Sequence, residues 1–147
     1  MRLSIQSVTH RTKSTAALQL AEDYDARLRP YVELESARFT AEAKLLEKAL
    51  PAGRTRPTLI LLDSRGKHLS SEEFAAWIGR QRDSGAQHLI FAIGPADGWS
   101  AAARERADLL LSFGPMTFPH ELARVMLAEQ IYRAFTILAG HPYHSGH

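Results

Sequence analysis

The stretch that decides the fold is TLILLDSRGKHLSSEEFAAWIGRQRDSGAQHLIFAIG, residues 58–94. Its first six residues, TLILLD, form a short apolar run ending in an acid, which is typical of a strand buried on both faces of a sheet. Ser70 and Glu73 have the spacing of a capping box, which predicts a helix that starts there and ends at Gly85. HLIFAIG, residues 88–94, predicts the next buried strand. The connection between the two strands is long enough for a parallel crossover.

The same pattern of strands and helices continues on both sides of this unit. RGKH, residues 65–68, is expected to be a loop, and PAGRTRP, residues 51–57, breaks the chain before the first buried strand. Apolar spacing predicts further strands over 2–8 and 108–113 and further helices over 16–31, 39–50 and 121–140, the last ending at Gly140. Strands alternating with helices predict an α/β fold with a largely parallel sheet, and the length of 147 residues suits one domain, 1–147.

The composition is that of an ordinary globular protein. Hydrophobic residues make up 45% of the chain, and the formal net charge is only +2. The absence of cysteine excludes disulfides, thiolate zinc sites and a cysteine nucleophile. The N-terminal segment is polar without a signal-peptide core, and no apolar run is long enough to cross a bilayer. We therefore expect a soluble cytoplasmic protein.

The predicted last helix is apolar on two sides, so it needs two partners for burial. One side holds Leu127, Ile131, Ala134 and Leu138, and roughly the other side holds Leu122, Val125, Met126 and Tyr132. The sheet would cover one side. A second subunit or another element of the same chain would cover the other, and because a small chain has little surface for this purpose we expect a homodimer.

Three loops follow predicted strands and are the first place to look for a ligand, because ligands of open α/β sheets bind at the carboxyl ends of the strands. The first of them lies in LLDSRGK, residues 61–67. AIGPADG, residues 92–98, lacks the dinucleotide-binding glycine pattern and a phosphate-binding lysine, so it predicts either a tight turn or a ligand loop. LSFGPMTFPH, residues 111–120, is either a rigid connection or a loop that holds an adenine against Met116 and Phe118.

Single charged residues near these loops have both functional and structural interpretations. Asp63 ends a buried strand and would serve as a ribose-binding acid, a catalytic base or a turn cap. Arg124 and Arg133 lie on the predicted last helix, where arginines are usually solvated or in ion pairs. They gain a functional meaning only if they border the same cleft as the three loops.

The C-terminal stretch HPYH, residues 141–144, raises the question of a metal site. Two histidines without thiolates offer too few ligands for a tetrahedral zinc site, so no metal is expected. A frayed terminus is the ordinary alternative. The functional alternative is that Tyr143 and the histidines stack on bases and contact phosphate.

The run FPHELARVMLAEQIYRAFTILAGHPYH, residues 118–144, resembles the C-terminal signature of the RlmH (YbeA-like) family of ribosomal RNA large subunit methyltransferases, which belong to the SPOUT class. The likeness continues upstream through LLDSRGK, AIGPADGWS and LSFGPMT. The resemblance implies a small α/β domain with a C-terminal trefoil knot, working as a homodimer. It implies transfer of a methyl group from S-adenosyl-L-methionine to N3 of a pseudouridine in 23S rRNA of the assembled ribosome.

The resemblance also implies roles for individual residues. It assigns cofactor binding to Leu62, Gly94, Gly114, Pro115, Met116, Thr117, Phe118 and Pro119. It assigns nucleotide positioning to Arg133, Tyr143 and His144. Methyl transfer requires an aligned acceptor and loss of the N3 proton, so Arg133 is expected to stabilise the anion and His144 to take the proton.

One departure from the family pattern lies in the glycine loop. The family usually reads Gly-Gly-Pro-x-Gly, whereas this chain has Pro95 between Gly94 and Ala96. Proline removes a backbone N–H, and cofactor affinity should fall if that donor touches the cofactor. The alternative to an enzyme is therefore a non-catalytic module that binds S-adenosylmethionine or a nucleotide through an altered glycine loop.

Overall fold

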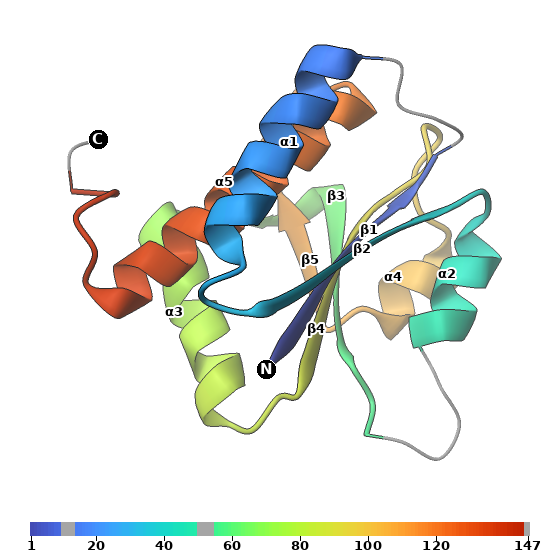
Figure 1. Ribbon diagram of the computed structural model, residues 1–147. Helices are drawn as coiled ribbons and strands as arrows, with labels where there is room; N and C mark the ends of the chain where they lie inside the picture. Colours follow the sequence, from blue (N-terminus) through green and yellow to red (C-terminus); the bar gives the residue numbers. More distant parts are fainter. Residues whose placement is uncertain (10–13, 50–54, 146–147) are drawn as a thin grey trace.

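A single parallel sheet covered by helices on both faces makes up the computed structural model, which describes residues 1–9, 14–49 and 55–145 (Figure 1). The strands are β1 (Arg2–Val8), β2 (Glu33–Phe39), β3 (Thr58–His68), β4 (His88–Ile93) and β5 (Leu109–Ser112). The helices are α1 (Thr15–Leu28), α2 (Glu42–Ala49), α3 (Ser71–Asp83), α4 (Ala101–Arg106) and α5 (His120–Ala139). The strand order is β2-β1-β4-β3-β5, and every pairing is parallel.

The alternation of side chains along the central strands builds two hydrophobic cores. In β4, Leu89, Phe91 and Ile93 face the core beneath α1, α3 and α5, while Ile90 and Ala92 face the core beneath α2 and α4. Both sets are almost completely buried. Figure 1 shows the first three helices on one side of the sheet and the other two on the opposite side. Burial on both faces explains why these strands read as continuous apolar runs.

The path of β3 around β5 is the unusual feature of the sheet. Leu111 of β5 pairs with Leu62 in the first part of β3 and with Lys67 in the second part. A residue in a strand pairs with one neighbouring strand on each side, so the two parts of β3 lie on opposite sides of β5. The segment of β3 between Leu62 and Lys67 crosses β5 from one side to the other. At the crossing, a Cβ added to Gly66 would lie 2.5 Å from the backbone carbon of Leu110. The crossing therefore requires a residue without a side chain.

The predicted elements are confirmed in the second half of the chain, with the capping box of Ser70 and Glu73 and the left-handed cap at Gly140 in place. The loop prediction for 65–68 is wrong, because β3 continues to His68. The expected helix over 39–50 covers only α2, since residues up to Phe39 form β2. The sequence patterns missed β2 and α4. The helix expected over 16–31 ends at Leu28, and the predicted break over 51–57 lies partly outside the described residues.

The two apolar sides of α5 find partners within the same chain. Leu127 and Ile131 are fully buried in the core under the sheet, and Tyr132 packs against Tyr24 of α1 with ring centroids 6.4 Å apart. Leu138 lies against Gly79 of α3. On the second side, Val125 and Tyr132 are thus covered within the chain, whereas Leu122 is 50% exposed, so only this end of α5 is left for a further partner. Within the described residues, no helix has the length and hydropathy needed to cross a membrane.

Replacing Gly66 with alanine tests the crossing. The added methyl group would overlap the backbone of β5, which cannot move aside as a flexible side chain can, so we expect the free energy of unfolding to fall by about 1–3 kcal/mol. Urea unfolding measures the change. Ser64→Ala, at an exposed position two residues away, is the matched control and should leave the midpoint in place. A Gly66→Ala midpoint equal to that of the unchanged protein would contradict the crossing described above.

Candidate functional site

The three loops singled out from the sequence meet at one edge of the sheet, because β4, β3 and β5 are neighbours. β3 leads to α3 on one face and β4 leads to α4 on the other (Figure 1). Adjacent parallel strands whose connections leave to opposite faces form the kind of crevice in which α/β proteins bind ligands. The fold thus gathers segments that are separate in the sequence into one candidate site.

Trp99 joins the ends of β3 and β4. Its indole Nε1 donates a hydrogen bond to the carbonyl oxygen of Leu62 at 2.8 Å, and its side chain is buried. A Cβ on Gly94 would lie 2.6 Å from the indole ring. Leu62 and Gly94, both assigned to the cofactor, are therefore brought together, and glycine is required at position 94 to admit the tryptophan.

The loop after β5 is tied to the other two by polar contacts. His120 Nε2 donates a hydrogen bond to the carbonyl oxygen of Gly94. Ser112 Oγ donates to the carbonyl oxygen of Ser64 at 3.3 Å and accepts from the backbone N–H of Gly114 at 3.0 Å. Gly114 has a φ of 117°, which favours glycine. The start of this loop is thus held to the crossing segment of β3.

Beyond Gly114 the loop turns toward solvent. Pro115, Thr117 and Pro119 are exposed, and Met116 is 76% exposed, so it packs on nothing that would bury it. Phe118 is partly buried against the main core. The exposed backbone and the thioether are available to a ligand that covers the edge of the sheet.

Asp63 and Arg104 form an ion pair that fixes the β3 loop to α4. Arg104 Nε lies 2.6 Å from Asp63 Oδ2, and the aspartate side chain is only 4% exposed. The other carboxylate oxygen accepts from the backbone N–H of Arg65 at 2.8 Å. Burial alone would raise the pKa of Asp63, but these hydrogen bonds and the nearby positive charges outweigh it and lower the pKa. Asp63 therefore acts as a turn cap and an ion-pair partner.

Pro95 begins a tight turn in the glycine loop. Its carbonyl oxygen accepts from the backbone N–H of Gly98 at 2.9 Å, and Gly98 has a φ of 89°. Proline fits this position because the turn uses its carbonyl and makes no use of an N–H. The consequence of Pro95 for cofactor affinity stays a prediction.

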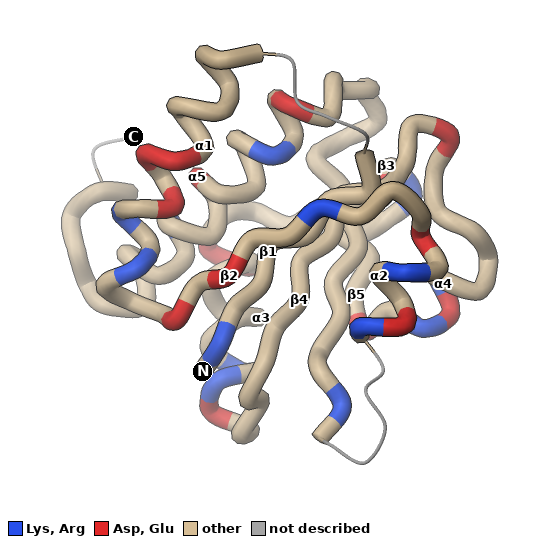
Figure 2. Tube along the Cα trace, turned by 45° about the vertical axis from the view of Figure 1, so that its right-hand side comes forward, with Lys and Arg blue, Asp and Glu red and all other residues tan. Residues whose placement is uncertain are grey.

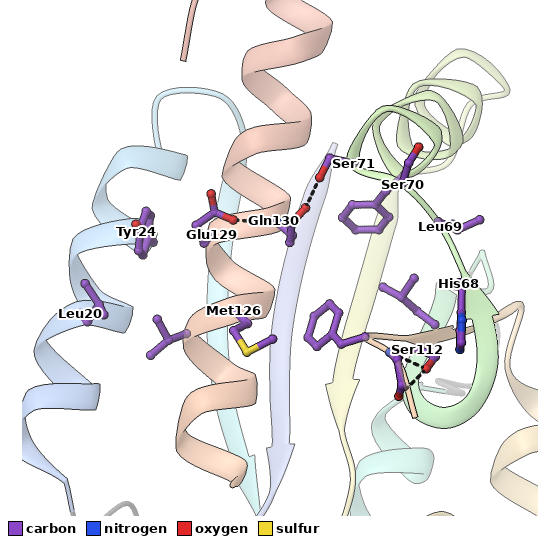
Figure 3. A pocket seen from close by; sticks show the side chains of 15 residues that line it. Leu20, Tyr24, His68, Leu69, Ser70, Ser71, Ser112, Met126, Glu129 and Gln130 are labelled. Atoms are coloured by element: carbon purple, nitrogen blue, oxygen red, sulfur yellow. Dashed lines mark hydrogen bonds between the residues drawn. The ribbon is translucent and has the colours of Figure 1, made fainter. Parts of the chain in front are cut away.

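A cavity of about 580 Å³ lies beside this edge, between α1, α3 and α5 (Figure 3). Its size is that of a small-molecule site. Most of its lining is apolar, with Leu20, Phe74, Val125 and Met126 among the contributors. The polar groups at its wall come from His68, Ser70, Ser71, Ser112, Glu129 and Gln130. Gly114 is the member of the proposed cofactor set that lines the cavity.

The C-terminal tail is packed on α5, so the interpretation of HPYH, residues 141–144, as a frayed end is wrong. The Tyr143 ring lies 4.8 Å from that of Tyr132, centroid to centroid, and the guanidinium of Arg133 lies 5.0 Å from the Tyr143 centroid. Glu129 Oε1 accepts hydrogen bonds from Tyr143 Oη at 3.1 Å and from Arg133 Nε at 2.9 Å. Burial and the charge of Glu129 raise the pKa of Tyr143, so its phenol stays protonated.

His144 is held between two charged side chains. Arg133 Nη1 lies 2.9 Å from His144 Nδ1, and Glu72 Oε1 lies 2.7 Å from His144 Nε2. Because a guanidinium only donates, Nδ1 must accept and the ring proton sits on Nε2, which donates to Glu72. This hydrogen bond lowers the pKa of Glu72. Docked in this way, His144 is a neutral imidazole with both nitrogens engaged.

The cofactor set and the nucleotide set lie at different ends of α5. His120 begins the helix next to the loops, and Arg133 follows 13 residues later, which corresponds to about 20 Å along the axis. Glu129 connects the two regions, because it lines the cavity and also binds Arg133 and Tyr143. Arg124 belongs to neither set. It pairs with the buried Asp25 of α1 at 2.6 Å.

Sequence reasoning missed three residues of the site, namely Trp99, Glu129 and Glu72. Trp99 and Glu72 contact partners that are far away in the sequence, so spacing gave no signal for them. Glu129 could have been found in part, because it lies four residues before Arg133 on the same helix, whereas its bond to Tyr143 spans 14 residues. Among the described residues, no group of three His, Asp or Glu side chains is placed to hold a metal ion.

The sequence that builds this sheet and its loops matches a family model described as "Predicted SPOUT methyltransferase" over residues 1–144. The chain belongs to the SPOUT methyltransferase family. Its fold is similar to that of the SpoU methyltransferase AviRb from Streptomyces viridochromogenes, solved in complex with AdoMet, with a TM-score of 0.50. That match covers 89% of this chain and 56% of the other at 14% identity, so it supports the fold alone.

Several relatives share the name ribosomal RNA large subunit methyltransferase H. The protein from Koribacter versatilis is 51% identical over 137 residues, which cover 93% of this chain and 94% of that protein. The protein from Xanthobacter autotrophicus is 48% identical, with 98% of this chain and 99% of that protein covered. The protein from Brucella ovis is 45% identical, with the same coverage. The similarity therefore spans 94–99% of the length of these relatives.

Replacing Asp63 with asparagine should lower the free energy of unfolding by about 1–3 kcal/mol at neutral pH, because the ion pair with Arg104 is lost in a buried position. The lowered pKa of Asp63 gives the pH dependence. The contribution of the ionised carboxylate to the free energy of unfolding is fully present above pH 3.8, the ordinary pKa of an aspartate. It disappears as the pH falls through the lower pKa that Asp63 has in the folded state. Urea unfolding of both proteins between pH 7 and pH 2 measures the difference. Asp97→Asn, at an exposed carboxylate, is the control, and a difference in stability that does not shrink as the pH falls would contradict the assignment.

Proposed function

We propose that the chain transfers a methyl group from S-adenosyl-L-methionine to N3 of a pseudouridine in 23S rRNA of the assembled ribosome. The observation that carries this proposal is the near full-length similarity to ribosomal RNA large subunit methyltransferase H proteins, at 45–51% identity. The convergence of the three loops at the edge of β3, β4 and β5 supports it. A cytoplasmic location follows from the ribosomal substrate.

The loops fit the cofactor by their chemistry. Leu62, Gly94 and residues 114–119 offer backbone groups at one edge, and the adjoining cavity adds apolar walls with a few polar groups, as nucleoside ligands require. When bound, S-adenosylmethionine supplies a methyl group already activated by its sulfonium. The loop residues hold and orient that group and exclude water. In-line positioning then accounts for most of the rate.

The tail residues are proposed to handle the acceptor. Arg133 would stabilise the N3 anion by its charge, and Tyr143 would stack on the base. His144 would take the proton through Nδ1, the nitrogen that carries none in the docked tail. Arg133 must leave Nδ1 before that step, so the docked arrangement represents a resting state.

A homodimer would bring the two sets of residues together. Leu18, Leu20 and Leu122 are 45–50% exposed on α1 and α5, beside the loops and the cavity. A second copy packed on this face would offer its tail to the loops of the first, across the roughly 20 Å that separates them within one chain. The trefoil knot is part of the same proposal, and the position of β5 between the two parts of β3 supports it.

The double variant Leu18→Glu, Leu122→Glu should be monomeric, because two buried carboxylates at the proposed interface cannot be desolvated at low cost. Light scattering after size exclusion measures the mass. The unchanged protein and an Ala76→Glu control, at an exposed position on α3, should both be dimers. A monomeric unchanged protein, or a dimeric double variant, would rule out this interface.

Incubation with labelled S-adenosylmethionine and 70S ribosomes that lack the modification tests the function. We expect methylation of one pseudouridine, and a loss of about a hundredfold in rate for Arg133→Ala with cofactor affinity retained, because Arg133 lies outside the cofactor loops. Arg80→Ala, an exposed arginine of α3, is the control. Calorimetric binding of S-adenosylmethionine without any transfer to ribosomes would instead support the non-catalytic module.

A further inference from the structure

A short basic segment lies on the part of β3 that follows the crossing. Arg65, Lys67 and His68 are all exposed, and they border the candidate site because His68 also lines the cavity (Figure 3). Strand geometry places Arg65 and Lys67 on one side and Gly66 on the other. Gly66 faces the backbone of β5, so the two cationic side chains point away from the sheet toward solvent.

Within the described part of the chain, Arg65 and Lys67 are distinguished from the other exposed cations by their position beside the candidate site, and not by the lack of an ion pair, which they share with the exposed residues Arg27, Arg29, Arg38, Lys44, Lys48 and Arg80. Figure 2 shows basic and acidic positions interspersed over the molecule. Among the described residues, ion pairs engage Arg2, Arg56, Arg82, Arg104, Arg106, Arg124 and Arg133. Neither Arg65 nor Lys67 forms an ion pair within the same residues. Asp63, two residues before Arg65 in the sequence, forms its ion pair with Arg104 at 2.6 Å, and the charge of Arg65 also helps to lower the pKa of this aspartate.

The backbone that carries these side chains is held firmly. Lys67 pairs with Leu111 and His68 pairs with Ser112 in the sheet, and the backbone N–H of Arg65 donates to Asp63 Oδ1 at 2.8 Å. Two cations on a fixed strand lose less conformational freedom on binding than cations on a mobile loop. A strand bearing charges at alternate positions presents them along a line, as a nucleic-acid backbone presents its phosphates.

We propose that Arg65 and Lys67 form a contact surface for the phosphate backbone of ribosomal RNA beside the target nucleotide. This inference rests on the proposed function and adds to it the part of the protein that grips the substrate outside the reacting centre. Lysine and arginine are the residues that proteins use for phosphate contacts, and such contacts position a protein without reading sequence. A chain with a net charge of only +2 needs a local surface of this kind.

The test is binding and methylation of 70S ribosomes lacking the modification, at a series of salt concentrations. For the double variant Arg65→Glu, Lys67→Glu we expect weaker binding and a slope of log affinity against log salt that is smaller by about 2, or about 1 for each lost phosphate contact. At saturating ribosome the rate of methyl transfer should be retained, so the defect falls on KM and spares kcat. Cofactor affinity, measured by calorimetry, should be unchanged.

The matched control is Lys44→Glu, Lys48→Glu, which makes the same change in net charge on two exposed residues of α2, on the other face of the sheet. An equal loss in both double variants would overturn the proposal, because the effect would then come from total charge. An unchanged salt slope in the Arg65 and Lys67 variant would also overturn it. If charge reversal impairs folding, the neutral variant Arg65→Gln, Lys67→Gln should show the same decrease in the salt slope. Failure of the proposed function is separate, since it appears as absence of methylation by the unchanged protein.

Discussion

The crossing of β3 over β5 is the constraint on which the rest of the molecule depends. The chain can make it only because Gly66 has no side chain where the backbone of Leu110 and Leu111 passes. By placing β5 between its two parts, β3 anchors the last strand on both edges, and α5 leaves that strand from a fixed point. A contact between two backbones tolerates no repacking, so this position has less freedom than any apolar position of the two cores.

The loops of the candidate site lie next to the crossing and are held to one another by hydrogen bonds and an ion pair. Three connections end at one edge, and each is tied to another by a polar contact that uses a backbone carbonyl or a buried charge. Trp99 holds Leu62, Arg104 holds Asp63, and His120 holds Gly94. Loops fixed in this way are already arranged before a ligand arrives, so less conformational entropy is lost on binding.

The sequence predicted those parts of the fold that rest on local chemistry. Buried parallel strands such as β4 can be recognised in the sequence by their apolar runs, and the start of α3 can be recognised by its capping box. The sequence did not predict β2, because this edge strand, ELESARF, is mostly exposed and has no apolar pattern. It did not predict the second part of β3 either, because RGKH is polar and its pairing depends on Leu111, which is distant in the sequence. For the site, a resemblance supplied the candidate residues. The contact of Trp99 with Leu62 and that of Glu129 with Tyr143 depend on tertiary structure, whereas the pair of Glu129 and Arg133 has the i,i+4 spacing of a helix and could have been read from the sequence.

Glu129 shows how the two ends of the site are coupled. One oxygen of its carboxylate binds both Arg133 and Tyr143, while the same side chain stands in the wall of the cavity. An anion formed at the acceptor would compete with Glu129 for Arg133, and His144 becomes free to accept a proton only when Arg133 moves. In the proposed reaction, arrival of the acceptor and release of His144 from Arg133 would thus be parts of one rearrangement. The HPYH tail, which in isolation resembles a metal ligand pair, acquires its meaning from the helix on which it is docked.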